Sequence, residues 1–358
     1  IFFYRVCGTG MGACACLAKE AGFEVAGADM TFSPPMSTYL ETLDIPLSKL
    51  SDLKKEDLKD YDLVVVGNSV PRTSEYARFV EELGIPFTSF PSFLGEFILK
   101  DREVIGLSGT HGKTTTTYFL TQMLETLGEE PGYFIGGIID GRPPSKLGKS
   151  KFFTIESDEY DSAYFQKISK FRVYEINHLV ITSLEFDHAD IFNSIEDIKN
   201  EFAASLPGLT GEIIVNDEYK AIFDLKEKFD KKNDWQVYGH KSELGPFSIE
   251  TNSEVTKFIV RFNDELVEFS TNIIGEHNIL NITSCILLLD RLGFTKVDVQ
   301  KSVAELGLVK RRQEVRGNYQ GAIVIDDFAH HPRAIELTTE AIKARFPGKE
   351  IITVFEPI

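Results

Sequence analysis

Long apolar runs are absent from the 358-residue sequence. No stretch approaches the ~20 residues that a helix needs to cross a bilayer. The apolar start, Ile1-Phe2-Phe3, is too short for the core of a signal peptide. We therefore expect no membrane partner. Hydrophobic residues at 42% are nevertheless enough to form a buried core.

Cysteine and basic residues are also scarce. The four cysteines, Cys7, Cys14, Cys16 and Cys285, lack the paired C-x-x-C spacing of zinc sites. Their use as small buried residues fits a reducing cytoplasm. Lys and Arg number 38 against 55 Asp and Glu, so the formal net charge is −17. Because nonspecific nucleic-acid binding needs basic surface, we expect no nucleic-acid partner. From the cysteines we expect a cytoplasmic protein.

A glycine-rich loop stands between two structured segments in residues 103–120. The apolar run 104–107 predicts a buried strand, and a helix is predicted over 115–127. Between them lies Gly109-Thr110-His111-Gly112-Lys113-Thr114. This order favours a phosphate cradle, in which Lys113 reaches the terminal phosphates and the Thr114 hydroxyl binds Mg²⁺. Leu107 occupies a position where the common P-loop pattern has glycine, so an ordinary strand-to-helix turn is the alternative.

A second glycine turn lies near the start of the chain, in Gly8-Thr9-Gly10-Met11-Gly12-Ala13. We predict strands over 2–6 and 23–28 on either side of a helix over 13–21. Asp29 ends the second strand about 20 positions after the first glycine. Dinucleotide-binding folds use this spacing to bring the turn to a pyrophosphate and the acid to a ribose hydroxyl. A packing turn in an α/β domain is the alternative.

The rest of the chain keeps alternating between strand and helix patterns, which predicts parallel sheets covered by helices. A strand over 322–325, a helix over 334–344 and a strand over 351–355 are too small for a stable domain. We therefore predict three α/β units, at residues 1–100, 101–312 and 313–358, of which the third is incomplete. Further strands are expected over 63–66, 86–91, 152–155, 179–182 and 213–215, antiparallel strands within 255–271, and helices over 38–43, 76–83 and 277–292.

Acidic residues follow two of the predicted central strands, at 156–161 and 185–188. Ligands of parallel sheets bind at the carboxyl ends of the strands. We therefore expect Glu156 and His188 to converge with Thr114 on Mg²⁺ beside the phosphates. A solvated acidic loop and an ordinary loop histidine are the alternatives.

Three further polar groups stand at element boundaries. Asn278 and Asn281 share one face of a predicted helix, where they either bind a ligand or supply first-turn polarity. Asp326-Asp327 and His330-His331 follow another strand, and capping explains them better than a zinc site does. Arg311-Arg312 is either a solvated linker pair or a pair that swings onto a triphosphate.

Together these motifs resemble those of the Mur ligases, ATP-dependent amide-forming enzymes of bacterial cell-wall assembly. The resemblance covers essentially the whole chain. It implies a Rossmann-like N-terminal domain for UDP-N-acetylmuramate, a central P-loop domain for ATP and Mg²⁺, and a Rossmann-like C-terminal domain that brings the amine substrate. It rests on residues 109–115, Glu156, Glu-Phe-Asp-His at 185–188, Gly-Glu-His-Asn-x-x-Asn at 275–281, Arg311-Arg312 and Asp-Asp-Phe-Ala-His-His-Pro at 326–332.

The resemblance also implies a role for each candidate residue. The catalytic set would be Lys113, Glu156 and His188, and the metal would be held by Thr114, Glu156 and His188. ATP would contact Gly109, Thr110, His111, Gly112, Lys113, Thr114, Thr115, Asn278, Asn281, Arg312 and Asp327. The UDP moiety would contact Gly8, Thr9, Gly10, Met11, Gly12, Asp29 and Asn68.

Within the family, the chain is similar to the branch that recycles cell-wall peptides. That branch joins L-Ala-γ-D-Glu-meso-diaminopimelate to UDP-N-acetylmuramate through an acyl phosphate. The L-alanine-adding branch is one alternative, and an NAD-dependent oxidoreductase or nucleotide-binding sensor is the alternative of another class. Two segments depart from the family pattern, Tyr4-Arg5 and Glu356-Pro357-Ile358. The recycling-type motifs are residues 33–38, Gly67-Asn68, Ser169-Lys170-Phe171 and residues 185–192.

Overall fold

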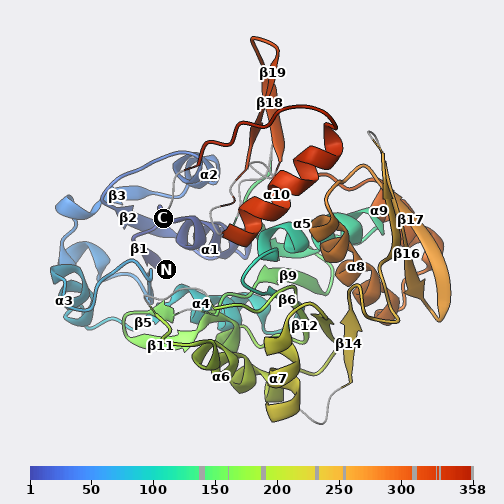
Figure 1. Ribbon diagram of the computed structural model, residues 1–358. Coiled ribbons are helices and arrows are strands. Elements are labelled where there is room, and N and C mark those ends of the chain that lie inside the picture. The colour runs from blue at the N-terminus through green and yellow to red at the C-terminus, as the bar shows by residue number, and fades with distance from the viewer. Residues whose placement is uncertain are drawn as a thin grey trace.

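Three groups of elements follow one another along the chain, and we call them the first, central and third units (Figure 1). The first contains a five-stranded sheet, the central a seven-stranded sheet, and the third a hairpin with one helix. No helix in the described part of the chain is long and apolar enough to cross a membrane. The computed structural model describes residues 1–136, 142–159, 161–186, 191–229, 234–252, 255–308, 313–327, 329 and 332–355.

The sheet of the first unit is entirely parallel, in the order β3-β2-β1-β4-β5. Helices cover both faces of such a sheet, so its central strands read as unbroken apolar runs. All three residues of β1 and of β4 are accordingly buried. The elements are β1 (Phe2–Tyr4), α1 (Thr9–Glu20), β2 (Ala26–Asp29), α2 (Met36–Thr42), β3 (Leu47–Lys49), β4 (Val64–Val66), α3 (Glu75–Glu81), β5 (Phe87–Ser89) and α4 (Phe90–Phe93).

The first glycine turn is shorter than its sequence suggested. β1 ends at Tyr4, not at residue 6, and α1 begins at Thr9, not at residue 13. Most of the glycine run therefore forms the first turns of a helix. A Cβ on Gly12 would lie 2.1 Å from Met36 Sδ, so this glycine allows α1 and α2 to pack closely. Arg5 carries the sharp change of direction with φ +69°.

The central sheet has the order β14-β13-β12-β6-β9-β7-β8, and only the β7–β8 pair is antiparallel. Alternate residues of its strands point to opposite faces. Ile105 and Leu107 of β6 pack against α5, α8 and α9, whereas Leu179 and Ile181 of β12 pack towards α6 and α7. The strands are β6 (Glu103–Ser108), β7 (Gly132–Phe134), β8 (Ser145–Lys146), β9 (Phe152–Glu156), β12 (His178–Ile181), β13 (Ile213–Asn216) and β14 (Trp235–Tyr238).

The helices of the central unit and a small antiparallel sheet complete its core. The antiparallel pattern predicted within 255–271 is confirmed by the pairing of β16 with β17, to which β15 is added. Their apolar faces join α8 and α9 in one buried cluster. These elements are α5 (Lys113–Thr126), α6 (Ile195–Ser205), α7 (Lys220–Phe229), β15 (Phe247–Thr251), β16 (Thr256–Phe262), β17 (Glu265–Thr271), α8 (Glu276–Arg291) and α9 (Lys296–Ala304), with the pair β10 (Asp161–Ala163) and β11 (Gln166–Ser169) near the first unit.

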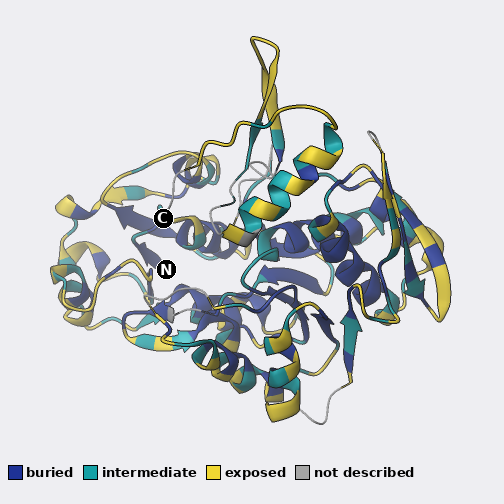
Figure 2. Ribbon diagram, in the orientation of Figure 1, coloured by how far each residue is buried: buried dark blue, intermediate teal, exposed yellow. Residues whose placement is uncertain are grey.

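The third unit is a projecting hairpin and a helix. β18 (Glu314–Tyr319) pairs antiparallel with β19 (Ala322–Asp326), and α10 (Pro332–Arg345) follows. Most of the hairpin is exposed (Figure 2). The strand predicted over 351–355 is wrong, because these residues pair with no other described strand and Val354 is 93% exposed. An apolar run rich in β-branched residues forms a strand only beside a free sheet edge.

The first and central units are joined by hydrogen bonds as well as by the chain. Ser145 Oγ donates to the carbonyl of Ala13 at 2.8 Å, and Leu147 N donates to Glu20 Oε2 at 2.7 Å. Both acceptors lie on α1, so the short β8 edge of the central sheet runs along that helix.

Candidate active site

The glycine-rich loop joins β6, in the middle of the seven-stranded sheet, to α5. The helix begins at Lys113 rather than at Thr115. Gly112 caps it with φ +88°, and a Cβ at this position would lie 2.9 Å from Asn281 Oδ1. Only glycine tolerates both this left-handed backbone and so close a neighbour. The loop backbone therefore lies directly against α8.

Two residues that follow β12 hold the loop in place. Thr182 Oγ1 hydrogen-bonds the carbonyl of Ser108 at 3.1 Å, and Ser183 Oγ accepts from His111 N at 2.7 Å. β12 is the parallel neighbour of β6, so its carboxyl end lies beside the loop. The sequence analysis did not predict a role for either hydroxyl, because the only signal for one is that Thr182 and Ser183 directly follow an apolar run.

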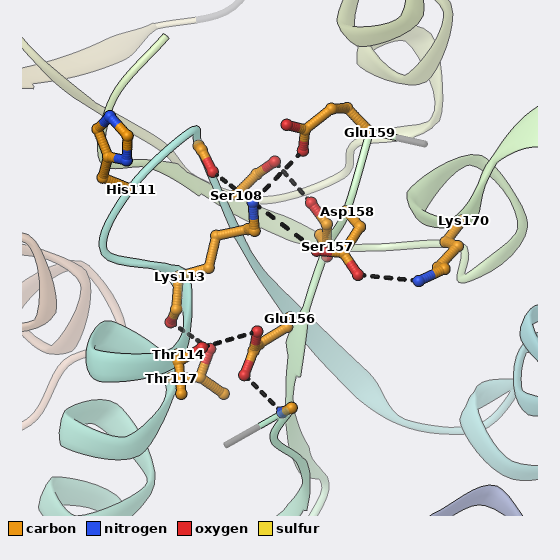
Figure 3. Close-up of polar contacts among 12 residues, drawn as sticks. Ser108, His111, Lys113, Thr114, Thr117, Glu156, Ser157, Asp158, Glu159 and Lys170 are labelled. Carbon is orange, nitrogen blue, oxygen red and sulfur yellow. Dashed lines mark hydrogen bonds and ion pairs between the residues drawn. The ribbon is translucent and has the colours of Figure 1, made fainter. Parts of the chain in front are cut away.

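The ammonium group of Lys113 lies among carboxylates (Figure 3). Its Nζ donates to the Gly109 carbonyl at 2.7 Å and lies 3.8 Å from Asp158 Oδ1 and 3.6 Å from Glu159 Oε2. Burial by itself would lower the pKa of this amine, but the charges of Glu159, Asp158 and Glu156 more than offset it and raise the pKa above its usual value. Lys113 is therefore a fixed positive charge beside the glycine loop.

Glu156, at the end of β9, lies beside the start of α5. Its Oε2 accepts from Thr114 Oγ1 at 3.0 Å, and its Oε1 accepts from Gly136 N at 2.6 Å. Burial and then the charge of Asp158 raise its pKa to about 7, although Gly136 N–H, Lys113 and Thr114 act in the opposite direction. A buried carboxylate next to a hydroxyl is an oxygen donor set that suits a hard cation such as Mg²⁺.

A second lysine completes this charge cluster. Lys170 Nζ lies 3.0 Å from Asp158 Oδ2 and over the ring of Phe90, 5.4 Å from its centroid. Asp158 thus lies between two ammonium groups, Lys113 and Lys170 (Figure 3). The sequence contained the acidic run but no spacing that pairs it with a lysine from a separate segment.

A pocket beside the loop extends from the central unit to the third unit. Asn278 donates through Nδ2 to the Ile274 carbonyl at 2.8 Å, which fixes the side chain at the start of α8. Ala341 of α10 is buried and lies close to Gly275, so α10 covers this end of α8. The lining includes His111, Gly112, Thr115, Thr182, Ser183, Asn216, Glu218, Tyr219, Glu276, His277, Asn278, Leu280, Asn281, Gln313, Asp327, Ala329, Ala334, Leu337 and Thr338.

A loop that can hold phosphates thus continues into a pocket that can hold a nucleoside, as a nucleotide site requires. Residues 107–289 match the family profile described as "Mur ligase middle domain". Residues 1–102 match "Mur ligase family, catalytic domain", and residues 311–357 match "Mur ligase, glutamate ligase domain".

The chain belongs to the Mur ligase family. It is 38% identical over 366 residues to a UDP-N-acetylmuramate–L-alanyl-γ-D-glutamyl-meso-2,6-diaminoheptandioate ligase of Escherichia coli K12, covering 100% of this chain and 78% of that protein. It is 30% identical over 366 residues to a UDP-N-acetylmuramate–L-alanine ligase of Lactobacillus delbrueckii subsp. bulgaricus, with 100% and 78% coverage. A solved murein peptide ligase from Psychrobacter arcticus superposes with a TM-score of 0.79 at 30% identity, covering 97% of this chain and 76% of that one.

The Mur ligase fold brings many of the expected ATP-site residues together. Residues 109–115, Asn278 and Asn281 lie at the loop and its pocket. Asp327 lines the far side, where its carboxylate accepts from Gln313 N and Ala329 N, each at 2.8 Å. His188 and Arg312, as well as Arg311, His330 and His331, lie outside the described residues.

The residues expected to bind UDP in this Mur ligase gather at the carboxyl edge of the first sheet. Asp29 is buried, and its carboxylate accepts from Cys7 N and from Met30 N, each at 2.7 Å. Arg5 Nε lies 3.5 Å from the same carboxylate. Asp29 therefore organises the turn that carries Gly8, Thr9 and Gly10. Asn68, just after β4, is exposed, whereas Met11 and Gly12 are buried in α1.

Proposed function

We propose that this Mur ligase joins L-Ala-γ-D-Glu-meso-diaminopimelate to UDP-N-acetylmuramate with ATP, in the recycling of cell-wall peptides. The observation that carries the proposal is the 38% identity, along the whole chain, to a relative named for that reaction. The relative named for L-alanine as acceptor is less similar, at 30%. Family membership, together with a phosphate loop in the central unit, favours a ligase over an oxidoreductase or a nucleotide sensor.

The chemistry proceeds in two steps. A carboxylate is a poor electrophile, so the carboxylate of UDP-N-acetylmuramate first takes the γ-phosphoryl group of ATP and ADP leaves. The amine of the peptide then attacks the acyl phosphate, inorganic phosphate leaves with the C–O electron pair, and the amine loses a proton. Such transfers depend chiefly on positioning and on stabilising negative charge.

Lys113 would stabilise that charge. Its ammonium group is oriented by Asp158 and Glu159 at the loop where the phosphates would lie. The N-terminus of α5 and the backbone of Gly112 add further N–H groups. Asn278, Asn281 and Asp327 would position the nucleoside in the adjoining pocket.

Mg²⁺ would be held by Thr114, Glu156 and His188. The closeness of Thr114 Oγ1 and Glu156 Oε2 at 3.0 Å, with burial around the carboxylate, suits a divalent cation. A bound Mg²⁺ would neutralise charge on the phosphates. Binding of such a cation would release the proton of Glu156 to solvent, and Gly136 N–H would keep the carboxylate oriented.

The first unit would hold UDP-N-acetylmuramate at its sheet edge, through residues 8–12, Asp29 and Asn68. We place the unit boundaries near residues 100 and 312, and we propose the cytoplasm as the location because ATP and UDP-linked sugars are its substrates. Arg312 would reach the phosphates of ATP when the third unit closes on the central one.

The test is ADP release by the purified protein with MgATP and UDP-N-acetylmuramate. The two reactions compared contain either the tripeptide or L-alanine as acceptor. We expect kcat/KM for the tripeptide to exceed that for L-alanine about a hundredfold, because a site built for additional charged groups leaves them unpaired with alanine. Equal or reversed preference would assign the chain to L-alanine ligation. ADP release that needs no acceptor or UDP-sugar would refute both.

A further inference from the structure

Gln313 is a buried glutamine in the wall of the nucleotide pocket. It is 4% exposed, and it lies immediately before β18, at the entry to the third unit. Its neighbours in the pocket include His277, Asp327 and Thr338. None of the roles derived above uses its side chain.

The backbone of Gln313 is held in an unusual conformation. Its φ is +51°, in the left-handed region that a non-glycine residue seldom adopts. Asp327 Oδ2 accepts from Gln313 N at 2.8 Å, while Asp327 Oδ1 accepts from Ala329 N at 2.8 Å. The carboxylate thus ties the linker to the segment after β19. Backbone strain that is maintained by such contacts is common at ligand-binding positions.

In the side-chain amide of Gln313, the nitrogen has a hydrogen-bond partner and the oxygen has none among the described residues. Its Nε2 lies 3.4 Å from His277 Nε2, on α8. Its Oε1 is buried and has no hydrogen-bond partner among the described residues. Buried amide oxygens in native proteins nearly always have a partner, so an unpaired one on a residue that lines a pocket indicates a donor supplied by a ligand.

The position of the pocket indicates which part of a nucleotide would reach this oxygen. Phosphates lie at the glycine loop, where Lys113 and the N-terminus of α5 provide positive charge. The lining from α10 includes Ala334 and Leu337, whose apolar surface suits the faces of an aromatic base. Asp327 connects Gln313 to Thr338 of the same helix. Gln313 therefore lies on the base side of the pocket rather than on its phosphate side.

We propose that Gln313 selects the base of the nucleotide, with Oε1 accepting a hydrogen bond from the 6-amino group of adenine. A 6-oxopurine presents a carbonyl oxygen at this point, so two acceptors would face each other and neither would be paired. Asp327 is the positioning residue, because it holds the Gln313 backbone. The inference rests on the proposed function only in that a purine nucleoside triphosphate occupies the pocket.

The test compares ATP with inosine triphosphate, which replaces the 6-amino group by an oxo group. Affinities are measured by competition against a fluorescent ATP analogue, without UDP-sugar or acceptor. We expect the native protein to prefer ATP by about tenfold or more, and Gln313→Met to bring the two affinities to within about threefold, chiefly by weakening ATP. Gln320→Met is the matched control, since Gln320 has φ +50° and is exposed in the β18–β19 turn.

Four outcomes decide the matter. An ATP preference that is unchanged in Gln313→Met, with or without a lower melting temperature, would give Gln313 a structural role and overturn the proposal. Equal binding of both nucleotides by the native protein, or no binding of either, would also overturn it. If Gln313→Met does not fold, Gln313→Glu replaces it, because glutamate keeps an acceptor at this position and should still reject inosine triphosphate. Equal affinity of Gln313→Glu for the two nucleotides would count against the proposal. A native protein that discriminates between the nucleotides but releases no ADP with the substrates would instead refute the proposed reaction alone.

Discussion

Two glycine-rich segments follow the first strands of the two parallel sheets, and they are built differently. After β6, the glycines form a true loop, because the helix begins only at Lys113 and Gly112 keeps a left-handed backbone. After β1, the helix begins at Thr9, so Gly10 and Gly12 lie inside α1. Glycine spacing alone does not distinguish a ligand loop from a close helix contact. The points at which the strand ends and the helix begins make that distinction.

The two segments also differ in charge. The loop after β6 has a lysine among three carboxylates. The pKa of Lys113 and the pKa of Glu156 each depend on the charges of the neighbouring groups. The turn after β1 has one buried carboxylate, Asp29, whose hydrogen bonds go to the backbone of its own turn and strand. The first arrangement can respond to an added phosphate or cation, whereas the second chiefly fixes a backbone shape.

The strongest test of the comparison is Lys113→Ala. Removing the Lys113 ammonium group should lower kcat for ADP release by about a thousandfold or more, because the transferring phosphoryl group loses a fixed positive charge. The Lys113 side chain is only 14% exposed and lies among carboxylates, so a lower melting temperature is also expected. Stopped assays and a thermal melt measure the two effects. Near-native turnover would remove Lys113 from the mechanism.

Gly112→Ala should separate the ligand loop from the helix turn. The added Cβ would meet Asn281 Oδ1 and a backbone at φ +88° that alanine disfavours. We expect ATP affinity to fall about a hundredfold, or about 2.7 kcal/mol. Calorimetric titration with ATP gives the affinity, and binding of UDP-N-acetylmuramate to the first unit serves as the control. Loss of both affinities together would indicate general unfolding.

Glu156 predicts a pH dependence of stability in the absence of divalent cations. Its folded-state pKa of about 7 exceeds the usual value of 4.5, so the folded protein binds this proton more tightly than the unfolded chain does. The resulting stabilisation is fully present below pH ~4.5 and is lost as the pH rises through about 7, for a total of about 3 kcal/mol. Urea unfolding of Glu156→Gln in EDTA should show a flatter profile between these values. An equally steep profile would mean that another group is responsible.

Gly12→Ala should have the smallest effect, and on stability alone. Its Cβ would displace Met36, a flexible side chain, at a cost of about 1–2 kcal/mol. Thermal or urea unfolding measures this loss, while ATP affinity should remain native. A fall in ATP affinity as large as that of Gly112→Ala would show that the two glycine segments are not independent.

Strand and helix patterns predicted most of the central unit, because its elements are long and its strands are buried on both faces. The approach of Thr114 and Glu156 followed from one rule, the convergence of parallel strands at their carboxyl ends, whereas His188, the third residue of that prediction, lies outside the described residues. The Lys170–Asp158 pair and the contacts of Gln313 with His277 and Asp327 could not be predicted in this way, since they join segments whose separation depends on the whole fold. The strand predicted over residues 351–355 is wrong because an apolar pattern describes a single chain segment. It does not tell whether a sheet edge is available for that segment to pair with.

The hydrogen bonds from Ser145 and Leu147 to α1 have a mechanical consequence. They clamp the first unit along the edge of the central sheet, so these two units are expected to rotate as a single rigid body. Opening and closing of the nucleotide pocket would then depend on movement of the third unit against the central one. The distance between UDP-N-acetylmuramate on the first unit and ATP on the central unit would then stay nearly constant through the catalytic cycle. The amine substrate would be the reactant that moves.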